Sequence, residues 1–205
     1  MKDKMAIIGA GGHGRVCADI AKLNGYKEII FLDDGAKDFS GEYKVAGKTF
    51  DFEKYIGEYD FFIGIGTTET RKIFFDLLEK SGAQIVSLVH PNAIIGSNVE
   101  IKKGVAIMAG AVINTGTVLS KGTIINTCAS VDHDCTVEEF SHVSVGAHVC
   151  GTVSIGKNVW LGAGSTIINN IKICDDCFIG AGAVVVKNIE KNGTYIGVPA
   201  KIIKD

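Results

Sequence analysis

The sequence predicts two folds in succession. A small α/β domain with a Rossmann-like parallel sheet is expected over residues 1–88, and a left-handed parallel β-helix of hexapeptide repeats over residues 89–205. Aliphatic residues recur every six positions in the second half, whereas strands alternate with helices in the first half. The chain also combines 26 Gly with only 2 Pro, while 46% of its residues are hydrophobic. This composition indicates many regular turns rather than disorder.

The first half reads as short strands that alternate with amphipathic helices. Strands are expected at residues 5–9, 28–33, 59–64 and 84–89, and helices at residues 11–23 and 68–80. Such alternation favours a small parallel sheet with helices packed against it.

A glycine-rich loop follows the first expected strand. Residues 9–14 read GAGGHG and match the G-x-G-x-x-G pattern, and Asp33 and Asp34 follow about twenty residues later, where a ribose-binding acid is found in dinucleotide folds. Because the domain is too short for both halves of such a fold, we expect the loop to bind the phosphates of one nucleotide. Asp33 and Asp34 would then meet its base or ribose. The alternative is a tight turn without a ligand. This is disfavoured by the expected exposure of Gly12, His13 and Gly14 in one loop.

The second half carries an uninterrupted six-residue repeat. Sixteen aliphatic residues stand six positions apart from Ile95 to Val185. This period fits three short strands joined by tight turns, so that eighteen residues make one coil and strands of successive coils stack in parallel at about 4.8 Å. The aliphatic side chain is expected to point inward, and the residue four positions later is mostly small. Glycines that directly follow the aliphatic residue are expected to adopt turn conformations that other residues resist; they are Gly96, Gly156, Gly162 and Gly180.

One histidine of the repeat has a catalytic environment. His133 is the third residue of its hexapeptide and is expected to face outward, with Asp132 and Asp134 on either side. Asp134, or less readily Asp132, would orient the imidazole and raise its basicity. The alternative is an ordinary surface histidine among acids.

Residues eighteen positions apart extend this region over neighbouring coils. Gly151 is expected one coil above His133, where its backbone N–H can approach a thioester carbonyl without side-chain obstruction. Ala163 and Ala181 form a smooth ladder on a neighbouring face, along which an extended pantetheine arm would fit. His142 and His148 each end a hexapeptide and are expected on the surface of the solenoid.

Charge and composition exclude several classes of function. The net charge of −2 provides no basic stripe for nucleic acid, and no stretch approaches the length of a membrane span. The charged N-terminus runs directly into a strand and is not a signal peptide, so we expect a cytoplasmic protein with reduced thiols. Cys174 and Cys177 lack a second pair at zinc-site spacing, so no metal is expected.

The regular hexapeptides, the 9–14 loop and the sequence GVPAK at residues 197–201 together resemble the bacterial sugar acyltransferases of the sialic-acid O-acetyltransferase type. Residues 132–135 and 140–147 look most similar to UDP-4-amino-sugar N-acetyltransferases of the UDP-N-acetylbacillosamine type. The resemblance covers nearly the whole chain. It implies an acetyl-CoA-dependent enzyme that acetylates the 4-amino group of a nucleotide-linked, UDP-bearing sugar. It also implies a homotrimer whose active sites lie between subunits.

The resemblance also assigns residues. It makes His133 the general base and Asp134 its acidic partner, in a place where the family usually has Glu. The positions that match contacts to acetyl-CoA are His142, Gly151, Ala163 and Ala181, and those that match the nucleotide-sugar site are Gly11, Gly12, His13, Asp33, Asp34 and Gly64. His148 matches no assigned position and is expected to be structural.

Three alternatives remain open from the sequence. The acceptor would be a hydroxyl if the enzyme were a sugar O-acetyltransferase of the sialic-acid type. Hexapeptide coils also occur in zinc-dependent carbonic anhydrases, but these need three His at one metal, and the spacing of His133, His142 and His148 does not suggest that cluster. A non-catalytic module that binds sugar nucleotides is the third alternative.

Overall fold

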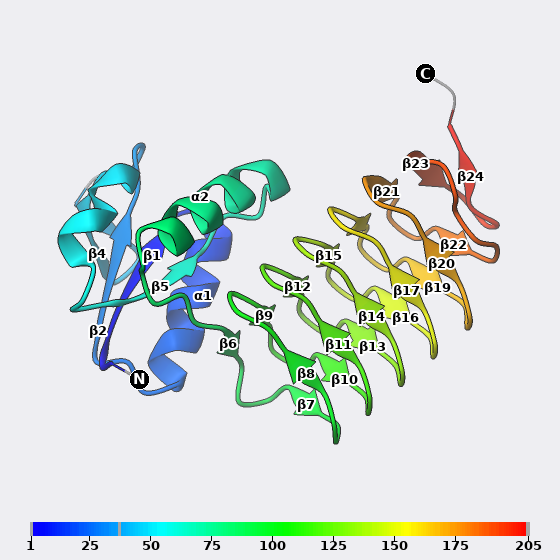
Figure 1. Cartoon of the computed structure of the whole chain (residues 1–205), viewed down its shortest axis with the longest axis horizontal. Helices are drawn as coiled ribbons and strands as arrows, with labels where there is room; N and C mark the ends of the chain where they lie inside the picture. The colour runs from blue at the N-terminus through cyan, green and yellow to red at the C-terminus, as the bar shows by residue number, and fades with distance from the viewer. Residues whose placement is uncertain (1, 37, 204–205) are drawn as a thin grey trace. The chain divides into compact units, whose positions relative to one another are not determined.

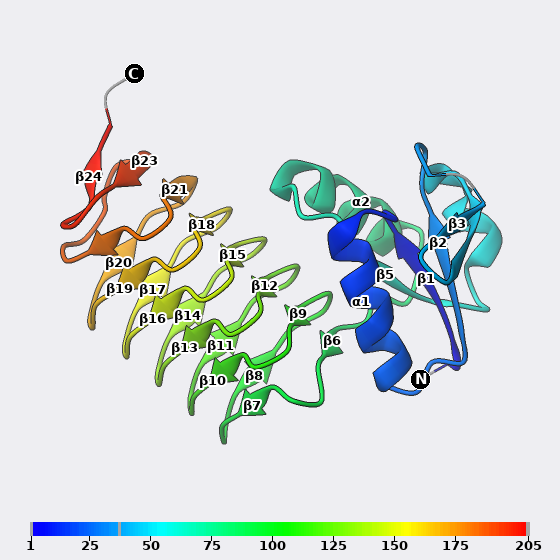
Figure 2. The same ribbon diagram turned by 180° about the vertical axis from the view of Figure 1, so that it is seen from behind.

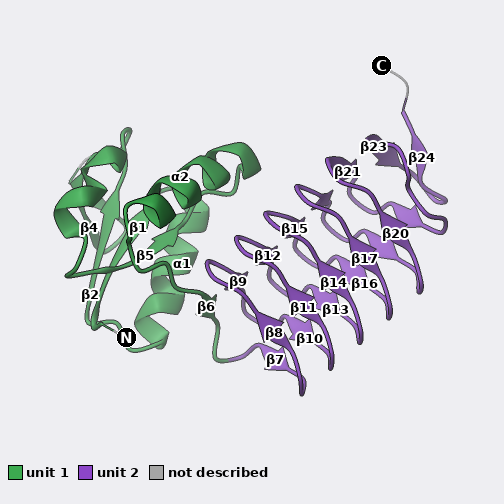
Figure 3. Ribbon diagram, in the orientation of Figure 1, with its two compact units in different colours: residues 1–91 green, residues 92–205 purple. Residues whose placement is uncertain are grey.

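The structure is a computed structural model that describes residues 2–36 and 38–203. It contains two compact units, one of residues 1–91 and one of residues 92–205 (Figure 3). The boundary expected from the sequence lies three residues earlier.

The first unit is built around a sheet with the strand order β3-β4-β2-β1-β5 (Figure 1). The central strand β1 pairs in parallel with β2 and β5, β2 pairs in parallel with β4, and β3 is antiparallel to β4. In chain order the elements are β1 (Lys4–Ile8), α1 (Gly12–Leu23), β2 (Glu28–Leu32), β3 (Phe39–Ser40), β4 (Tyr43–Gly47), the 3-10 helix η1 (Thr49–Tyr55), β5 (Asp60–Ile63), α2 (Thr68–Lys80) and β6 (Leu88–Val89).

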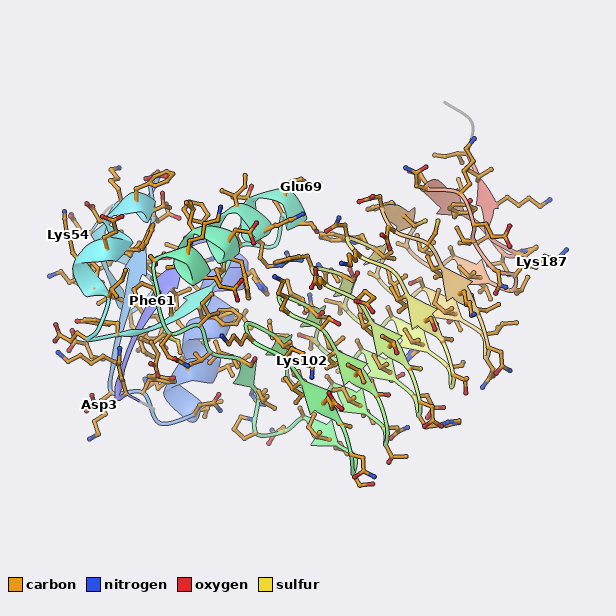
Figure 4. All side chains as sticks on the ribbon, viewed as in Figure 1. Asp3, Lys54, Phe61, Glu69, Lys102 and Lys187 are labelled. Carbon is orange, nitrogen blue, oxygen red and sulfur yellow. The ribbon has the colours of Figure 1, made fainter. Side chains whose placement is uncertain are left out.

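The core of this unit lies around the central strands. β5 is buried along its whole length, and Phe61 points into the interior of the unit (Figure 4). Helix α1 buries small residues such as Cys17, Ala18 and Ala21, which let it lie close to the sheet. Burial of one large apolar side chain stabilises a fold by about 1.5–3 kcal/mol, so the buried strands β1 and β5 contribute strongly to the stability of this unit.

The α/β class is confirmed, and both predicted helices are found. The predicted strand 84–89 is wrong as one element: Ile85 makes a single parallel bridge to Phe61, and β6 follows only at Leu88. The elements β3, β4 and η1 were not expected, because they are short and partly exposed and so carry too few apolar positions to mark them as elements of the sheet.

The second unit is the expected parallel β-helix, with three sheets around one interior (Figures 1 and 2). The β7 sheet contains β7, β10, β13, β16, β19 and β22. The β8 sheet contains β8, β11, β14, β17 and β20. The strands of this unit in the β9 sheet are β9, β12, β15, β18, β21, β23 and β24. Strands of successive coils pair in parallel between residues eighteen positions apart, as Ile113 with Val131.

The strands of the second unit are mostly two residues long. Their bounds are β7 (Ile94–Ile95), β8 (Glu100–Ile101), β9 (Ala106–Ile107), β10 (Val112–Ile113), β11 (Val118–Leu119), β12 (Ile124–Ile125), β13 (Ser130–Val131), β14 (Thr136–Val137), β15 (His142–Val143), β16 (His148–Val149), β17 (Ser154–Ile155), β18 (Trp160–Leu161), β19 (Thr166–Ile167), β20 (Lys172–Ile173), β21 (Cys177–Ile179), β22 (Val184–Val185), β23 (Gly193–Ile196) and β24 (Lys201–Ile202).

The six-residue register predicts the interior correctly. Each repeated aliphatic residue is the last residue of its strand, and every one from Ile107 to Val185 is buried. The small residues four positions later, such as Thr117 and Ala129, are also buried. Only the first coil departs from this pattern, because Ile95 is 36% exposed at the open end.

The turns of the coil have a second periodicity that the sequence did not reveal. The third residue after each aliphatic one, every six positions from Asn98 to Gly182, has a left-handed backbone with φ between 55° and 73°. The conformational role expected for Gly96, Gly156, Gly162 and Gly180 is therefore wrong, because their φ angles lie outside this region. They are glycines because the next coil approaches them closely: a Cβ at Gly162 would lie 2.6 Å from the backbone of the coil above.

The C-terminal residues pair with the last strand of every sheet. Val184 of β22 donates a hydrogen bond to the carbonyl of Gly197 (3.0 Å), and Ala200 donates back to Val184 (2.8 Å). Ile189 forms a parallel bridge with Ile173 of β20. In the β9 sheet, β23 pairs in parallel with β21 and β24 then runs antiparallel to β23.

Candidate active site

His133 and Asp134 form a hydrogen-bonded pair on the turn between β13 and β14. Nδ1 of His133 lies 2.8 Å from Oδ2 of Asp134. The hydrogen bond that Nδ1 donates to Asp134 is the main cause that raises the pKa of His133. Desolvation by burial opposes it, and the charges of Asp132 and Asp134 add to it. Because Nδ1 donates its proton to Asp134, Nε2 is the nitrogen able to accept one.

Asp132 has a different set of partners, which separates its role from that of Asp134. Its Oδ1 accepts hydrogen bonds from Nδ2 of Asn114 (2.7 Å) and from the backbone N–H of His133 (2.8 Å). These donors lower the pKa of Asp132, with Asn114 as the largest cause. The carboxylate on the imidazole is therefore that of Asp134 and not that of Asp132.

Gly151 lies directly above the imidazole of His133, one coil further along. Its neighbour Thr152 donates a backbone hydrogen bond to the carbonyl of His133 (2.9 Å). A Cβ at Gly151 would lie 2.5 Å from Nε2 and 2.7 Å from Cε1 of His133, well inside van der Waals contact. The absence of a side chain at residue 151 is thus what leaves room for the ring.

Ala163 and Ala181 are stacked on a different corner of the coil. Both are exposed, and Gly182 donates a hydrogen bond to the carbonyl of Ala163 (2.9 Å). Their turns lead from the β9 sheet into the β7 sheet, whereas the turns of His133 and Gly151 lead from the β7 sheet into the β8 sheet (Figures 1 and 2). Within one chain the β7 sheet separates the two groups of residues.

His142 differs from its expected place on the surface. It is only 5% exposed, because its ring packs against Trp160 with the ring centroids 4.3 Å apart. Nε2 of His142 lies 3.0 Å from Nδ2 of Asn126, a residue that the sequence analysis did not single out. His148 is exposed as expected, and its Nδ1 lies 2.9 Å from Oγ of Ser130 on the outer face of the β7 sheet.

The first unit contains a second candidate site, a cleft of about 420 Å³. All six residues predicted for nucleotide-sugar binding line it: Gly11, Gly12, His13, Asp33, Asp34 and Gly64. The cleft also includes residues that the sequence analysis missed, among them Thr49, Thr70 and Phe74. No local pattern marks these three, since they reach the cleft from η1 and α2 only through the tertiary fold.

The glycines around this cleft have two distinct roles. A Cβ at Gly11 or Gly12 would meet no atom within 4 Å, so these residues leave the N-terminus of α1 open to a ligand. Gly14 is buried rather than exposed, and a Cβ there would collide with the carbonyl oxygen of Gly9. A Cβ at Gly64 would lie 2.7 Å from Cα of Gly14. Gly9, Gly14 and Gly64 therefore let the strands and α1 pack closely.

His13 is held neutral at the edge of the cleft. Desolvation by burial, together with the charge of Arg71, lowers the pKa of His13 to about 4. Arg71 is buried in α2, and its Nη1 donates hydrogen bonds to the carbonyls of Gly66 (2.6 Å) and Ile65 (3.2 Å), both of which line the cleft. At neutral pH His13 can form hydrogen bonds to a ligand but carries no charge.

Both carboxylates of the cleft are already hydrogen-bonded to the protein. Asp33 accepts backbone N–H groups from Ala10 (2.8 Å), Gly35 (2.8 Å) and Ala36 (2.7 Å). Burial raises the pKa of Asp33, but these donors outweigh it and the net pKa is lowered. Asp34 accepts the hydroxyl of Thr49 (2.7 Å). Asp33 therefore braces the glycine-rich loop, while the more exposed Asp34 faces the cleft together with Thr49.

The described residues contain neither a metal-binding cluster nor a membrane-spanning helix. No group of three or more His, Cys, Asp or Glu side chains in residues 2–36 and 38–203 is arranged to hold a metal ion. None of the helices in this part of the chain is long and apolar enough to cross a membrane.

Family models match both units. Residues 4–78 match the PglD N-terminal domain, residues 91–121 match the hexapeptide repeat of succinyl-transferase, and residues 152–187 match the bacterial transferase hexapeptide model of six repeats.

Solved structures match the chain from end to end. The acetyltransferase domain of PglB from Neisseria gonorrhoeae FA1090 is 36% identical, with a TM-score of 0.96 over 98% of this chain and 100% of that one. The same domain in complex with acetyl coenzyme A is 35% identical, with a TM-score of 0.96 over 99% and 100% of the two chains. PerB from Caulobacter crescentus, in complex with CoA and GDP-perosamine, is 32% identical, with a TM-score of 0.91 over 98% and 97%.

Proposed function

The chain belongs to the hexapeptide-repeat acetyltransferases that carry a PglD N-terminal domain, and we propose that it acetylates the 4-amino group of a UDP-linked amino sugar. Its fold and its similarity to structures with acetyl-CoA and GDP-perosamine make it an acetyl-CoA-dependent sugar N-acetyltransferase. An amine acceptor is supported over the hydroxyl acceptor of a sugar O-acetyltransferase. The position of the amino group, the nucleotide and the residue roles below are proposals.

The observation that carries the residue roles is the exposed His133–Asp134 pair beneath Gly151. The sugar amine attacks the thioester carbonyl of acetyl-CoA, and Nε2 of His133 removes the proton from the attacking nitrogen. Asp134 stabilises the imidazolium that forms, and the N–H of Gly151 donates to the developing oxyanion. Collapse of the tetrahedral intermediate breaks the C–S bond, yields the amide, and returns the proton through His133 to the CoA thiolate. No covalent acetyl-enzyme is required, since the thioester is already activated.

Replacement of His133 tests this role directly. General-base catalysis typically contributes 10²–10⁴-fold, so His133→Ala should lower kcat by about that factor with an unchanged circular dichroism spectrum. A control is His148→Ala, which removes another exposed histidine of the coil and should leave kcat unchanged. Near-normal turnover of His133→Ala would exclude it as the base.

The acceptor is identified by offering a panel of sugar nucleotides. The protein is incubated with acetyl-CoA and UDP-, GDP- or CMP-linked sugars that carry either an amine or only hydroxyls, and the products are weighed by mass spectrometry. We expect one acetyl group on UDP-linked 4-amino sugars, as an amide that resists hydroxylamine. GDP is the main competitor, because PerB is similar and its structure contains GDP-perosamine. Acetylation of hydroxyl-only sugars would instead support the O-acetyltransferase.

Two corners of the coil support a site shared between subunits of a homotrimer. His133 and Gly151 lie on one side of the β7 sheet, and Ala163 and Ala181 lie on the other. If acetyl-CoA contacts both groups, as we propose, the two corners must come from different copies of the chain. His142, in β15 of the β9 sheet, would contribute from the same side as the alanines.

Mixed trimers test this arrangement. His133→Ala should inactivate one corner, and Ala163→Glu should block the proposed pantetheine groove at the other. Co-expression of the two variants should restore part of the activity, because some hybrid sites combine a native His133 with a native Ala163. Light scattering should give a trimer for all of them. Lack of recovery in verified mixed trimers would contradict a shared site.

We also propose a cytoplasmic location, where acetyl-CoA is available. It is supported by the cysteines of the described residues, which are all free thiols.

A further inference from the structure

Asp134 can reach His133 because of its unusual backbone. It occupies one of the left-handed turn positions, with φ of 56°, and its N–H donates to the carbonyl of Thr115 in the coil below (3.0 Å). Asp adopts this conformation more readily than most residues. The side chain is exposed, and its Oδ2 is the atom that pairs with the imidazole.

Gly116 lies directly beneath Asp134, eighteen residues earlier. It has the same left-handed backbone, with φ of 73°. A Cβ at Gly116 would lie 2.6 Å from Oδ1 of Asp134, whereas ordinary contacts begin at about 3.4 Å. Any side chain at residue 116 would therefore press on the carboxylate that holds His133.

The architecture of the coil does not itself require glycine beneath a left-handed Asp. At another corner Asn158 lies one coil below Asp176, and both have the same left-handed backbone. There Nδ2 of Asn158 donates a hydrogen bond to Oδ1 of Asp176 (2.9 Å). The side chain below can thus be accommodated, and it takes up the carboxylate above it.

We propose that Gly116 is a positioning residue of the acetyl transfer: by placing no side chain beneath Asp134, it leaves that carboxylate free to hold the imidazole of His133. The inference rests on the proposed role of His133 as general base. Gly116 contacts neither substrate. It acts indirectly, because it has no side chain that could bind the Asp134 carboxylate in place of His133.

The surroundings of His133 make its titration a direct readout of whether the Asp134 carboxylate stays on the imidazole. The charged groups that act on it are Asp132 and Asp134 of its own turn. The coil below contributes Asn114, Thr115 and Gly116, and the coil above contributes Cys150, Gly151 and Thr152. Asp132 is held by Asn114, so displacement of Asp134 is the change that a substitution at residue 116 would bring about.

The decisive variant is Gly116→Asn, which recreates the Asn158–Asp176 pair beneath the imidazole. Asn is accepted in this conformation elsewhere in the coil, so the variant should fold. We expect the His133 pKa, followed by NMR, to fall toward its ordinary value. The acidic limb of kcat/KM should move to lower pH by the same amount, and kcat should drop by roughly tenfold. The control is Gly146→Asn, since Gly146 has φ of 62° and open space around it, and it should leave the His133 pKa unchanged.

A double-mutant cycle completes the test. In an Asp134→Asn background, Gly116→Asn should have no further effect on pKa or kcat, because the carboxylate it diverts is gone. An unchanged His133 pKa in Gly116→Asn, or an equal loss of kcat in the Asp134→Asn background, would overturn the proposal. If Gly116→Asn fails to fold, Gly116→Ala gives the same readout. The NMR titration needs no turnover. It therefore tests the role of Gly116 independently of the proposed acetyltransferase activity.

Discussion

Addition of one methyl group at Gly151 should slow the enzyme without unfolding it. In Gly151→Ala the new Cβ would lie 2.5 Å from Nε2 of His133, and ordinary contact begins at about 3.4 Å. The ring must therefore move by about 1 Å. Because the imidazole is half exposed, it can swing outward into solvent and the coil need not deform.

The size of the effect follows from this displacement. A misplacement of about 1 Å at a catalytic group costs up to about 10²-fold in rate, so we expect kcat to fall by roughly 10- to 100-fold. Alanine retains the backbone N–H, so an oxyanion donor would not be lost. The φ of Gly151 is outside the left-handed region, so the substitution adds no backbone strain there, and Tm should change by no more than about 4 °C.

Steady-state kinetics and thermal unfolding of the same preparation measure both quantities. The matched control is Asn169→Ala, which alters the equivalent exposed position one coil above Gly151 and should retain wild-type kcat. If Gly151→Ala keeps wild-type kcat, the position of the imidazole beneath residue 151 does not govern the reaction. A large fall in Tm would instead mean that the coil, rather than the ring, absorbs the added methyl group.

Three further predictions concern protonation, stability and thiol reactivity. A base must be unprotonated to act, and Asp134 raises the pKa of His133; Asp134→Asn should therefore move the acidic limb of the kcat/KM profile to lower pH while its plateau falls. An unmoved limb would show that another group titrates there. Asp33→Ala removes the acceptor of three backbone N–H groups, two of them partly buried, and should destabilise the protein by about 1–3 kcal/mol in urea unfolding, and an unchanged midpoint would rule out the bracing role. Iodoacetamide should label the exposed Cys128 of the native protein, whereas Cys17, buried and with a raised pKa, should be labelled only after unfolding; mass spectrometry of peptides distinguishes the two.

The sequence predicted the coil well because every hexapeptide must place its aliphatic side chain in the interior. A single inserted residue would turn the aliphatic positions out of the interior, so the register from Ile107 to Val185 is read directly from the pattern. The same register places Gly151 above His133 correctly. It could not tell why Gly162 is a glycine, because the close approach of the coil above depends on backbone geometry that hydrophobic periodicity does not encode.

The first unit was predicted less completely, for a different reason. Its glycine-rich loop and two helices have local signals, but Thr49 and Phe74 reach the cleft from elements distant in sequence. The burial of His142 likewise comes from neighbours such as Trp160, eighteen residues away. Contacts of this kind arise from the fold as a whole, and a single sequence contains no local mark of them.

The C-terminal pairing has a consequence for the behaviour of the protein in concentrated solution. A solenoid of parallel strands ends in unpaired backbone groups that would accept the next coil of another molecule, and repeated addition would build a fibre. Here residues 189–202 pair with β22, β20 and β21, one strand from each of the three sheets, and β24 reverses direction. These pairs take up backbone groups that a parallel coil of another molecule would need, so the described C-terminal segment opposes end-to-end aggregation.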